Sequence, residues 1–187
     1  MSFPVFVQHR HIHLSQDDFV KLFGDRSWPS MTPLGHFGQF VTGLMIAVHS
    51  PTGWLDNVHV LGPSREHSQV ELTASEARAL GLDIPVRVSG DLVRSGNCVL
   101  KNDLNEVAVS QGVIIPARHL HVNEQTAKRL ELHHGQTIRL QVLRDPSVKI
   151  DQVTVRVHPT FCDSLHLNAD EAAKFWLDAQ DRVDLCV

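Results

Sequence analysis

Apolar and polar residues alternate in several short runs of this chain, which is the pattern of half-buried strands. Six segments show the period of two that a strand requires. They are residues 56–63 (DNVHVLGP), 84–91 (IPVRVSGD), 105–110 (NEVAVS), 136–143 (QTIRLQVL), 152–159 (QVTVRVHP) and 182–187 (RVDLCV). Helical patterns are few and short. Many short strands between Gly and Pro turns favour a barrel or a sandwich over a doubly wound sheet.

Four segments share a second pattern, in which a potential metal ligand, an aliphatic residue and a helix N-cap residue follow one another. They begin at His13 (HLSQDDFVKLFG), Glu71 (ELTASEARALGL), His121 (HVNEQTAKRLEL) and His166 (HLNADEAAKFWL). Three of them place an acid at capping-box spacing after the N-cap, namely Asp18, Glu76 and Glu171. We therefore predict four strand-to-helix units, each with its ligand at the end of a strand.

Two of these ligands have a second histidine two residues earlier, in the phrases RHIHLS at 10–15 and RHLHVN at 118–123. Residues i and i+2 of a strand share a face about 6.6 Å apart, so both imidazoles can lean onto one ion. Three protein ligands with an open position are typical of a catalytic zinc site. The candidate ligands are His11, His13, Glu71, His119, His121 and His166. The alternative is a histidine-rich surface on which each ring packs or caps locally.

The loop at residues 61–72 (LGPSREHSQVEL) carries Arg65 six residues before Glu71. The planar guanidinium of arginine suits phosphate or carboxylate oxygens, so Arg65 is a candidate for binding an anionic substrate. Taken alone, the motif is explained more simply by a solvated loop arginine. In the following segment 85–97 (PVRVSGDLVRSGN), Gly90 and Gly96 could bring backbone N–H groups to a phosphate, or could form a hairpin turn.

Composition excludes several classes of protein. The 187 residues carry a net charge of −4, which argues against a nucleic-acid-binding face. No apolar run reaches the roughly 18 residues of a membrane span, and the N-terminus lacks the layout of a secretory signal. The three cysteines, Cys98, Cys162 and Cys186, are widely spaced and form no disulfide framework, which predicts a reducing compartment.

With these motifs in this order, the chain resembles the phosphate propanoyltransferase family, the phosphotransacylases found with bacterial microcompartments for propanediol. The matching blocks extend over nearly the whole chain: RHIHLS, VLGPSREHSQVEL, ALGLDIPVRVSGDL, GVIIPARHLHV, VRVHPTF and LHLNADEA. The resemblance implies a mainly β fold with two interleaved β-barrel domains capped by short α-helices. One domain would comprise residues 1–28 and 111–187, and the other residues 29–110.

The resemblance also implies two zinc ions per chain. By position, His11, His13 and Glu71 would bind the first, with Glu71 coming from the other barrel, and His119, His121 and His166 would bind the second. Arg65 falls on a catalytic position that contacts phosphate. The implied reaction converts propanoyl-CoA or acetyl-CoA, with phosphate, into acyl phosphate and coenzyme A. No Ser or Cys nucleophile is required, so direct attack by phosphate is expected, with zinc as Lewis acid and template.

Some positions depart from the family pattern. The family usually has a long N-terminal extension that directs it into a microcompartment, whereas ten residues precede His11 here. We therefore expect a cytoplasmic enzyme without support for encapsulation. Its partners would be acyl-CoA, phosphate and acyl phosphate, with no nucleic acid or membrane and with a homodimer as one candidate assembly. Arg94 and Asn97 stand where the family has glycine. Two alternatives stay open, a non-catalytic metal- or CoA-binding homologue and a dizinc hydrolase of a thioester or phosphate bond.

Overall fold

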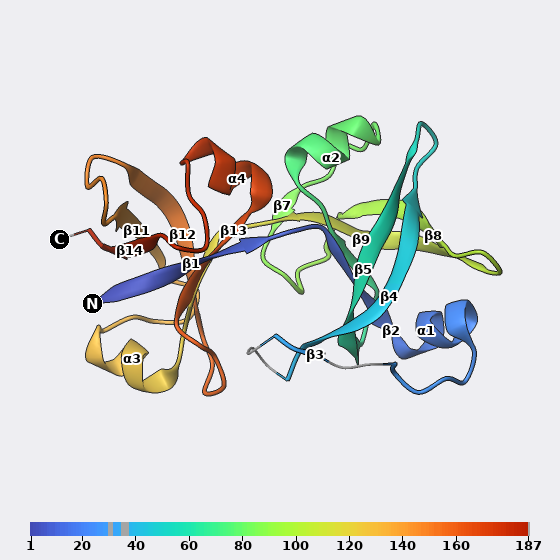
Figure 1. The fold of residues 1–187 in the computed structure, drawn as a ribbon, viewed down its shortest axis with the longest axis horizontal. Helices are drawn as coiled ribbons and strands as arrows, with labels where there is room; N and C mark the ends of the chain where they lie inside the picture. Colours follow the sequence, from blue (N-terminus) through green and yellow to red (C-terminus); the bar gives the residue numbers. More distant parts are fainter. Residues whose placement is uncertain (30–31, 35–37, 187) are drawn as a thin grey trace. The chain divides into compact units, whose positions relative to one another are not determined.

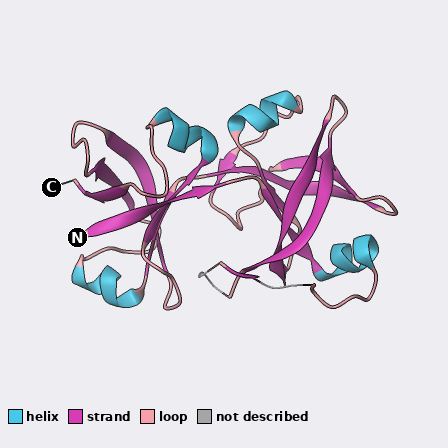
Figure 2. Cartoon of the chain, viewed as in Figure 1, coloured by secondary structure: helices cyan, strands magenta, loops and turns pink. Residues whose placement is uncertain are grey.

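The structure of the chain is a computed structural model that describes residues 1–29, 32–34 and 38–186. The chain divides into two compact units, one formed by Met1–His9 with Ala117–Val187 and the other by Arg10–Pro116. Figure 1 labels most elements of both units, and Figure 2 shows that strands dominate each of them, with short helices at their margins. The prediction of a mainly β fold with short capping helices is confirmed.

The unit that contains both termini is a closed six-stranded barrel with the strand order β1-β13-β10-β12-β11-β14. Its strands are β1 (Ser2–Gln8), β10 (His119–Val122), β11 (Thr137–Val142), β12 (Lys149–Val157), β13 (Ser164–Asn168) and β14 (Arg182–Leu185). Its helices are α3 (Glu124–Arg129) and α4 (Ala169–Lys174).

The central unit contains the strands β2 (His11–Ser15), β3 (Thr32–Pro33), β4 (Phe40–His49), β5 (Trp54–Arg65), β6 (Gln69–Glu71), β7 (Val86–Arg87), β8 (Gly96–Lys101) and β9 (Glu106–Pro116). Its helices are α1 (Gln16–Phe23) and α2 (Ala74–Ala79). The pairings β4–β5, β5–β2, β2–β6, β6–β9, β9–β8 and β8–β4 return to the first strand, so these six strands also close a ring.

The two units repeat one pattern of strand pairing. In the central unit β2 pairs parallel with β5 and antiparallel with β6, and β6 pairs parallel with β9. In the other unit β10 pairs parallel with β12 and antiparallel with β13, and β13 pairs parallel with β1. The order β10-α3-β11-β12-β13-α4-β14-β1 therefore corresponds to β2-α1-β4-β5-β6-α2-β8-β9. Only β1 differs in chain position, because it precedes its unit, and this interleaves the two units along the sequence.

Each unit has its own apolar core, which follows from the alternation within its strands. On β10, Leu120 and Val122 are fully buried in one hydrophobic cluster, and on β2, Ile12 and Leu14 are fully buried in the other. Side chains of a strand alternate between its faces. The histidines between these aliphatic residues therefore lie on the opposite face of each strand, outside the apolar cluster.

The observed units differ from the predicted domain limits at both junctions, because residues 10–28 and 111–116 lie in the central unit. The sequence-based division joins residues 1–28 to the C-terminal part, whereas residues from Arg10 onward lie in the central unit. The reason is strand pairing, because β1 pairs with β13 and β14, while β2 pairs with β5 and β6.

Five of the six predicted strand segments overlap strands of the structure, namely β5, β9, β11, β12 and β14. In the sixth, 84–91, only Val86–Arg87 is a strand, and the rest turns at Ser89 and Gly90. The last residue of the segment 182–187 lies outside the described residues. Among the helices that the structure describes, none has the length and apolar character needed to cross a membrane.

Candidate metal centres

Each of the four predicted strand-to-helix units is present, and each helix begins at the N-cap residue that the sequence indicates. The side chains of Ser15, Thr73, Asn123 and Asn168 each accept a hydrogen bond from the backbone N–H three residues later. These contacts satisfy donors at the first turn of a helix, so they fix where each strand ends. Complete capping boxes form at Thr73 with Glu76 and at Asn168 with Glu171.

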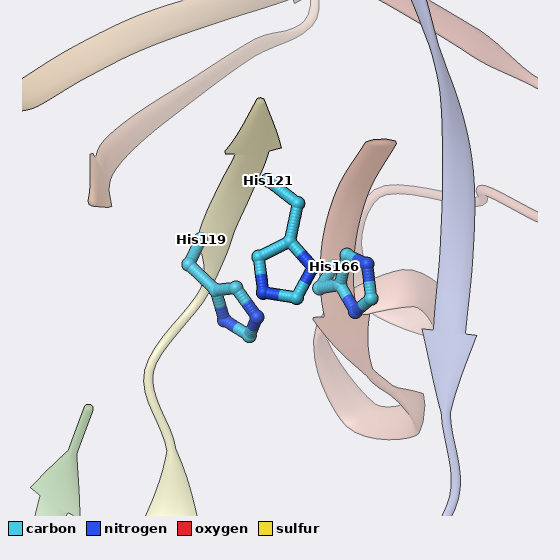
Figure 3. A group of neighbouring side chains, drawn as sticks. All are labelled: His119, His121 and His166. Atoms are coloured by element: carbon cyan, nitrogen blue, oxygen red, sulfur yellow. The ribbon is translucent and has the colours of Figure 1, made fainter. Parts of the chain in front are cut away.

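The second candidate cluster consists of His119, His121 and His166, all of them buried. His119 and His121 share one face of β10, and antiparallel pairing places His166 of β13 directly opposite His119. The potential ligand atoms of the three rings lie within 4.8 Å of one another. Figure 3 shows the three imidazole rings gathered between the two strands. The ring of His121 also stacks on Phe161, with ring centroids 3.6 Å apart.

The first candidate cluster repeats this arrangement in the central unit. His11 and His13 share one face of β2, and the antiparallel register places Glu71 of β6 opposite His11. Their potential ligand atoms also lie within 4.8 Å of one another. The Nε2 atom of His11 is 3.4 Å from Oε2 of Glu71. Glu71 was expected from the other barrel, but β2 and β6 are neighbours in one sheet, so all three residues belong to the same unit.

The arginine of each Arg-His-x-His phrase has the same partner in both units. Arg10 donates to Oε1 of Glu76 at 2.9 Å, and Arg118 donates to Oε1 of Glu171 at 2.7 Å. Both acids belong to the capping boxes of the helices that follow the third candidate ligand. Each arginine therefore links the strand with the His-x-His pair to the helix that follows the third candidate ligand. This helix is α2 in the central unit and α4 in the other unit.

Arg65 lies at the end of β5, beside the first cluster. Its Nη2 donates to Nε2 of His13 at 2.7 Å, and its Nη1 donates to Oγ of Ser89 at 3.1 Å. Burial lowers the pKa of His13 well below its ordinary value of 6.5, and the charges of Arg65 and His11 lower it further. His13 is therefore neutral near neutral pH, which is the form that binds a metal ion.

Arg65 also lines a cavity of about 730 Å³ within the central unit. Lys21, Ser68 and Gly90 contribute to the same wall, as do the acids Asp17, Asp18 and Glu66. A polar cavity of this size next to a cationic side chain can admit a small anion or part of a larger substrate.

The hydrogen bonds of two histidines bear on how a metal ion would bind in these clusters. Because an arginine N–H only donates, Nε2 of His13 must accept, so its lone pair points at Arg65 and a metal ion at this atom would displace that hydrogen bond. Because a carbonyl only accepts, the 2.9 Å contact of His119 Nδ1 with the Ala117 oxygen fixes the proton on Nδ1. Its Nε2 is then the ligand atom, in the arrangement usual for zinc-binding histidines. Ligand atoms placed tetrahedrally at ~2.1 Å from zinc would lie about 3.4 Å from one another. The candidate ligand atoms lie within 4.8 Å of one another, so side-chain shifts of less than about 2 Å would bring them to this spacing.

All six candidate ligands of the sequence analysis are thus brought together, in the two groups that the resemblance implies. Arg65 is placed beside the first of them. Sequence reasoning missed the polar residues that support the third ligand of each cluster, Gln69 and Ser164. Their signal was their position two residues before Glu71 and His166, on the same face of the strand.

The segment 89–97 also explains one departure from the family pattern. Arg94 has φ of 55°, a conformation that glycine adopts more readily than residues with a Cβ. Gly90, which precedes it, has φ of 100°.

The fold and the site define the class of this protein. It is a duplicated β-barrel protein, and each unit contains one cluster of three side chains of the kinds that bind metal ions. The chain matches the phosphate propanoyltransferase family over residues 4–178. It is 34% identical to the phosphate propanoyltransferase of Shewanella putrefaciens over 183 residues, which cover 97% of this chain and 87% of that one. It is 36% identical to that of Citrobacter rodentium over 177 residues, with coverage of 94% and 84%. It is 36% identical to that of Levilactobacillus brevis over 170 residues, with coverage of 90% and 81%.

The chain belongs to the phosphate propanoyltransferase family, and the resemblance stated from its motifs is confirmed. It is therefore an enzyme of the phosphotransacylase type.

Proposed function

We propose that this enzyme transfers a short acyl group, propanoyl or acetyl, between coenzyme A and inorganic phosphate, with two zinc ions per chain. The observation that carries the proposal is the pair of clusters, each with three buried candidate ligands. Arg65 lies beside the first cluster, next to His13. His11, His13 and Glu71 would hold one ion, and His119, His121 and His166 the other. When bound, zinc would supply Lewis acidity for the thioester carbonyl and for the departing thiolate.

Arg65 would bind phosphate through its planar fork and hold it for attack. A phosphate oxygen forms the new bond to the acyl carbon, the carbon–sulfur bond breaks, and the sulfur leaves with the bond's electron pair. The proton of the attacking phosphate balances the charge by passing to the thiolate. This step needs no covalent acyl-enzyme. Of the three cysteines, Cys98 is buried, and burial raises the pKa of its thiol to about 12. A thiol of that pKa is a poor nucleophile near neutral pH.

The loss of thioester absorbance tests this proposal, with propanoyl-CoA or acetyl-CoA and with phosphate present or absent. We expect consumption only with phosphate, and acyl phosphate as the product. Consumption without phosphate would identify a thioester hydrolase, and no consumption in either condition would identify a binding homologue. Both results would overturn the proposal.

His121→Ala tests the metal part of the proposal. A cluster reduced to two ligands holds zinc poorly, so metal analysis should fall from two zinc ions per chain to one, and most of the activity should be lost. His133→Ala is the matched control, because His133 is exposed and lies outside both clusters. If His121→Ala keeps two zinc ions, His121 is a packing residue and the second site fails.

A further inference from the structure

Gln69 is buried on β6, two residues before Glu71, and every polar group of its side chain has a partner. Its Nε2 donates to Oε1 of Glu71 at 2.5 Å and to Oγ of Ser89 at 2.9 Å. Its Oε1 accepts from the backbone N–H of Gly90 at 2.9 Å. Only 1% of the residue is exposed, so water does not compete for these contacts.

These contacts fix which way the amide faces. A backbone N–H can only donate, so the atom facing Gly90 must be the amide oxygen, and the NH₂ group must face Glu71 and Ser89. The amide therefore holds one oxygen of the Glu71 carboxylate, while the other oxygen lies on the side of His11. The turn that supplies the N–H needs the positive φ of Gly90.

The second unit repeats this support with different chemistry. Ser164 lies two residues before His166 and opposite His121, just as Gln69 lies two before Glu71 and opposite His13. The Ser164 hydroxyl donates to the Cys162 carbonyl at 3.1 Å, so it accepts from Nε2–H of His166 at 2.9 Å. In both units the residue two positions earlier thus holds the third candidate ligand. An amide N–H serves the carboxylate, and a hydroxyl oxygen serves the imidazole.

In the central unit this support also reaches an arginine. The Ser89 hydroxyl that accepts from Gln69 also accepts from Nη1 of Arg65 at 3.1 Å. A chain of hydrogen bonds therefore runs from Glu71 through Gln69 and Ser89 to Arg65.

We propose that Gln69 is a positioning residue that orients Glu71 toward a metal ion and, through Ser89, sets the guanidinium of Arg65 for phosphate. The phosphate part rests on the proposed function, whereas the metal part does not. Removing the amide should therefore weaken metal binding and phosphate binding together, although Gln69 touches neither.

The first test is Gln69→Leu, which keeps a similar volume and removes both N–H donors. Competition with a chromogenic chelator should show one of the two zinc ions bound about 10- to 100-fold more weakly. With zinc saturating, the KM for phosphate should rise while the KM for propanoyl-CoA stays unchanged. Gln69→Met, which also lacks the N–H donors, should weaken zinc to a similar extent. This second variant keeps the test decisive if Gln69→Leu does not fold.

Two variants separate the parts of the proposal. Ser89→Ala should raise the KM for phosphate and leave zinc affinity unchanged. It removes the hydroxyl that Gln69 and Arg65 share but keeps the hydrogen bond from Gln69 to Glu71. Ser164→Ala, the matched control in the other unit, should weaken one zinc ion and leave the KM for phosphate unchanged, because no link to Arg65 depends on it.

Unchanged zinc affinity in folded Gln69→Leu and Gln69→Met would overturn the proposal and make the amide a structural strut. Weaker zinc with an unchanged KM for phosphate would overturn the coupling to Arg65. If the wild-type chain binds two zinc ions but shows no phosphate-dependent reaction, the proposed function fails. The zinc measurements would then still decide the role of Gln69.

Discussion

Replacing Arg65 with alanine should separate substrate binding from metal binding. The guanidinium lies 2.7 Å from Nε2 of His13 and 3.1 Å from Oγ of Ser89, at the wall of the cavity in the central unit. Arginine stays protonated, so it contributes charge and donors but cannot itself ligate zinc. Its loss should therefore change phosphate binding and leave both clusters able to hold metal.

The magnitude follows from the kind of contact. One preorganised charge-assisted donor stabilises a transition state by about 2–4 kcal/mol, and Arg65 is only partly buried, so the lower half of this range applies. A loss of about 2–3 kcal/mol corresponds to a fall of roughly 30- to 150-fold in kcat/KM for phosphate. Zinc at the first cluster should bind as tightly as before or more tightly, because a nearby positive charge is removed.

The assay is the initial rate of propanoyl-CoA consumption with phosphate varied, alongside zinc analysis of the same samples. Arg65→Lys should recover only part of the loss, because lysine supplies the charge without the planar fork. Arg139→Ala, which breaks an exposed ion pair with Asp151, is the control for removing an arginine. Loss of zinc in Arg65→Ala, or an unchanged dependence on phosphate, would refute the assignment and make Arg65 a strut of the loop.

Three further predictions concern stability and reactivity. Burial, Arg65 and His11 lower the pKa of His13 in the folded chain. As pH falls below about 6.5, His13 is therefore protonated in the unfolded chain while it stays neutral in the folded chain, which favours unfolding. Thermal melts of the metal-free protein should therefore show a free energy of unfolding that falls below that pH, by up to about 1.4 kcal/mol per pH unit from this group. If His13→Gln loses free energy of unfolding with pH at the same slope, this prediction is wrong. A thiol reagent at pH 8 should label exposed Cys162 in the folded protein and leave Cys98 unlabelled until the protein unfolds, because burial raises the pKa of Cys98 to about 12. Labelling of Cys98 in the folded protein at the rate of Cys162 would be inconsistent with that burial. Asn168→Ala should lower the free energy of unfolding in urea by about 1 kcal/mol through loss of a capping box, and no change would mean that the cap is dispensable.

The local features of the candidate site could be read from the sequence because they depend on near neighbours in the chain. His-x-His on a strand places both rings on one face whatever the strand pairs with, and the N-caps at Ser15, Thr73, Asn123 and Asn168 need only the three residues that follow. The segment 84–91 was predicted too long as a strand for a related reason. Its alternation is real, but the turn at Gly90 is held by Gln69 from another strand, which no local pattern reveals.

The residues themselves therefore determined a mainly β protein with four capped strand ends and two pairs of histidines. The resemblance of its motifs implied the grouping of the six candidate ligands, by analogy with the family. Tertiary structure decided which strand faces which: the registers of β2 with β6 and of β10 with β13 bring Glu71 to His11 and His166 to His119. It also explained the repeated arginine, since Arg10 and Arg118 reach acids 66 and 53 residues away. The physical reason is that caps and alternation arise from contacts within one turn or one strand. Register and long-range hydrogen bonds instead depend on how the whole barrel closes.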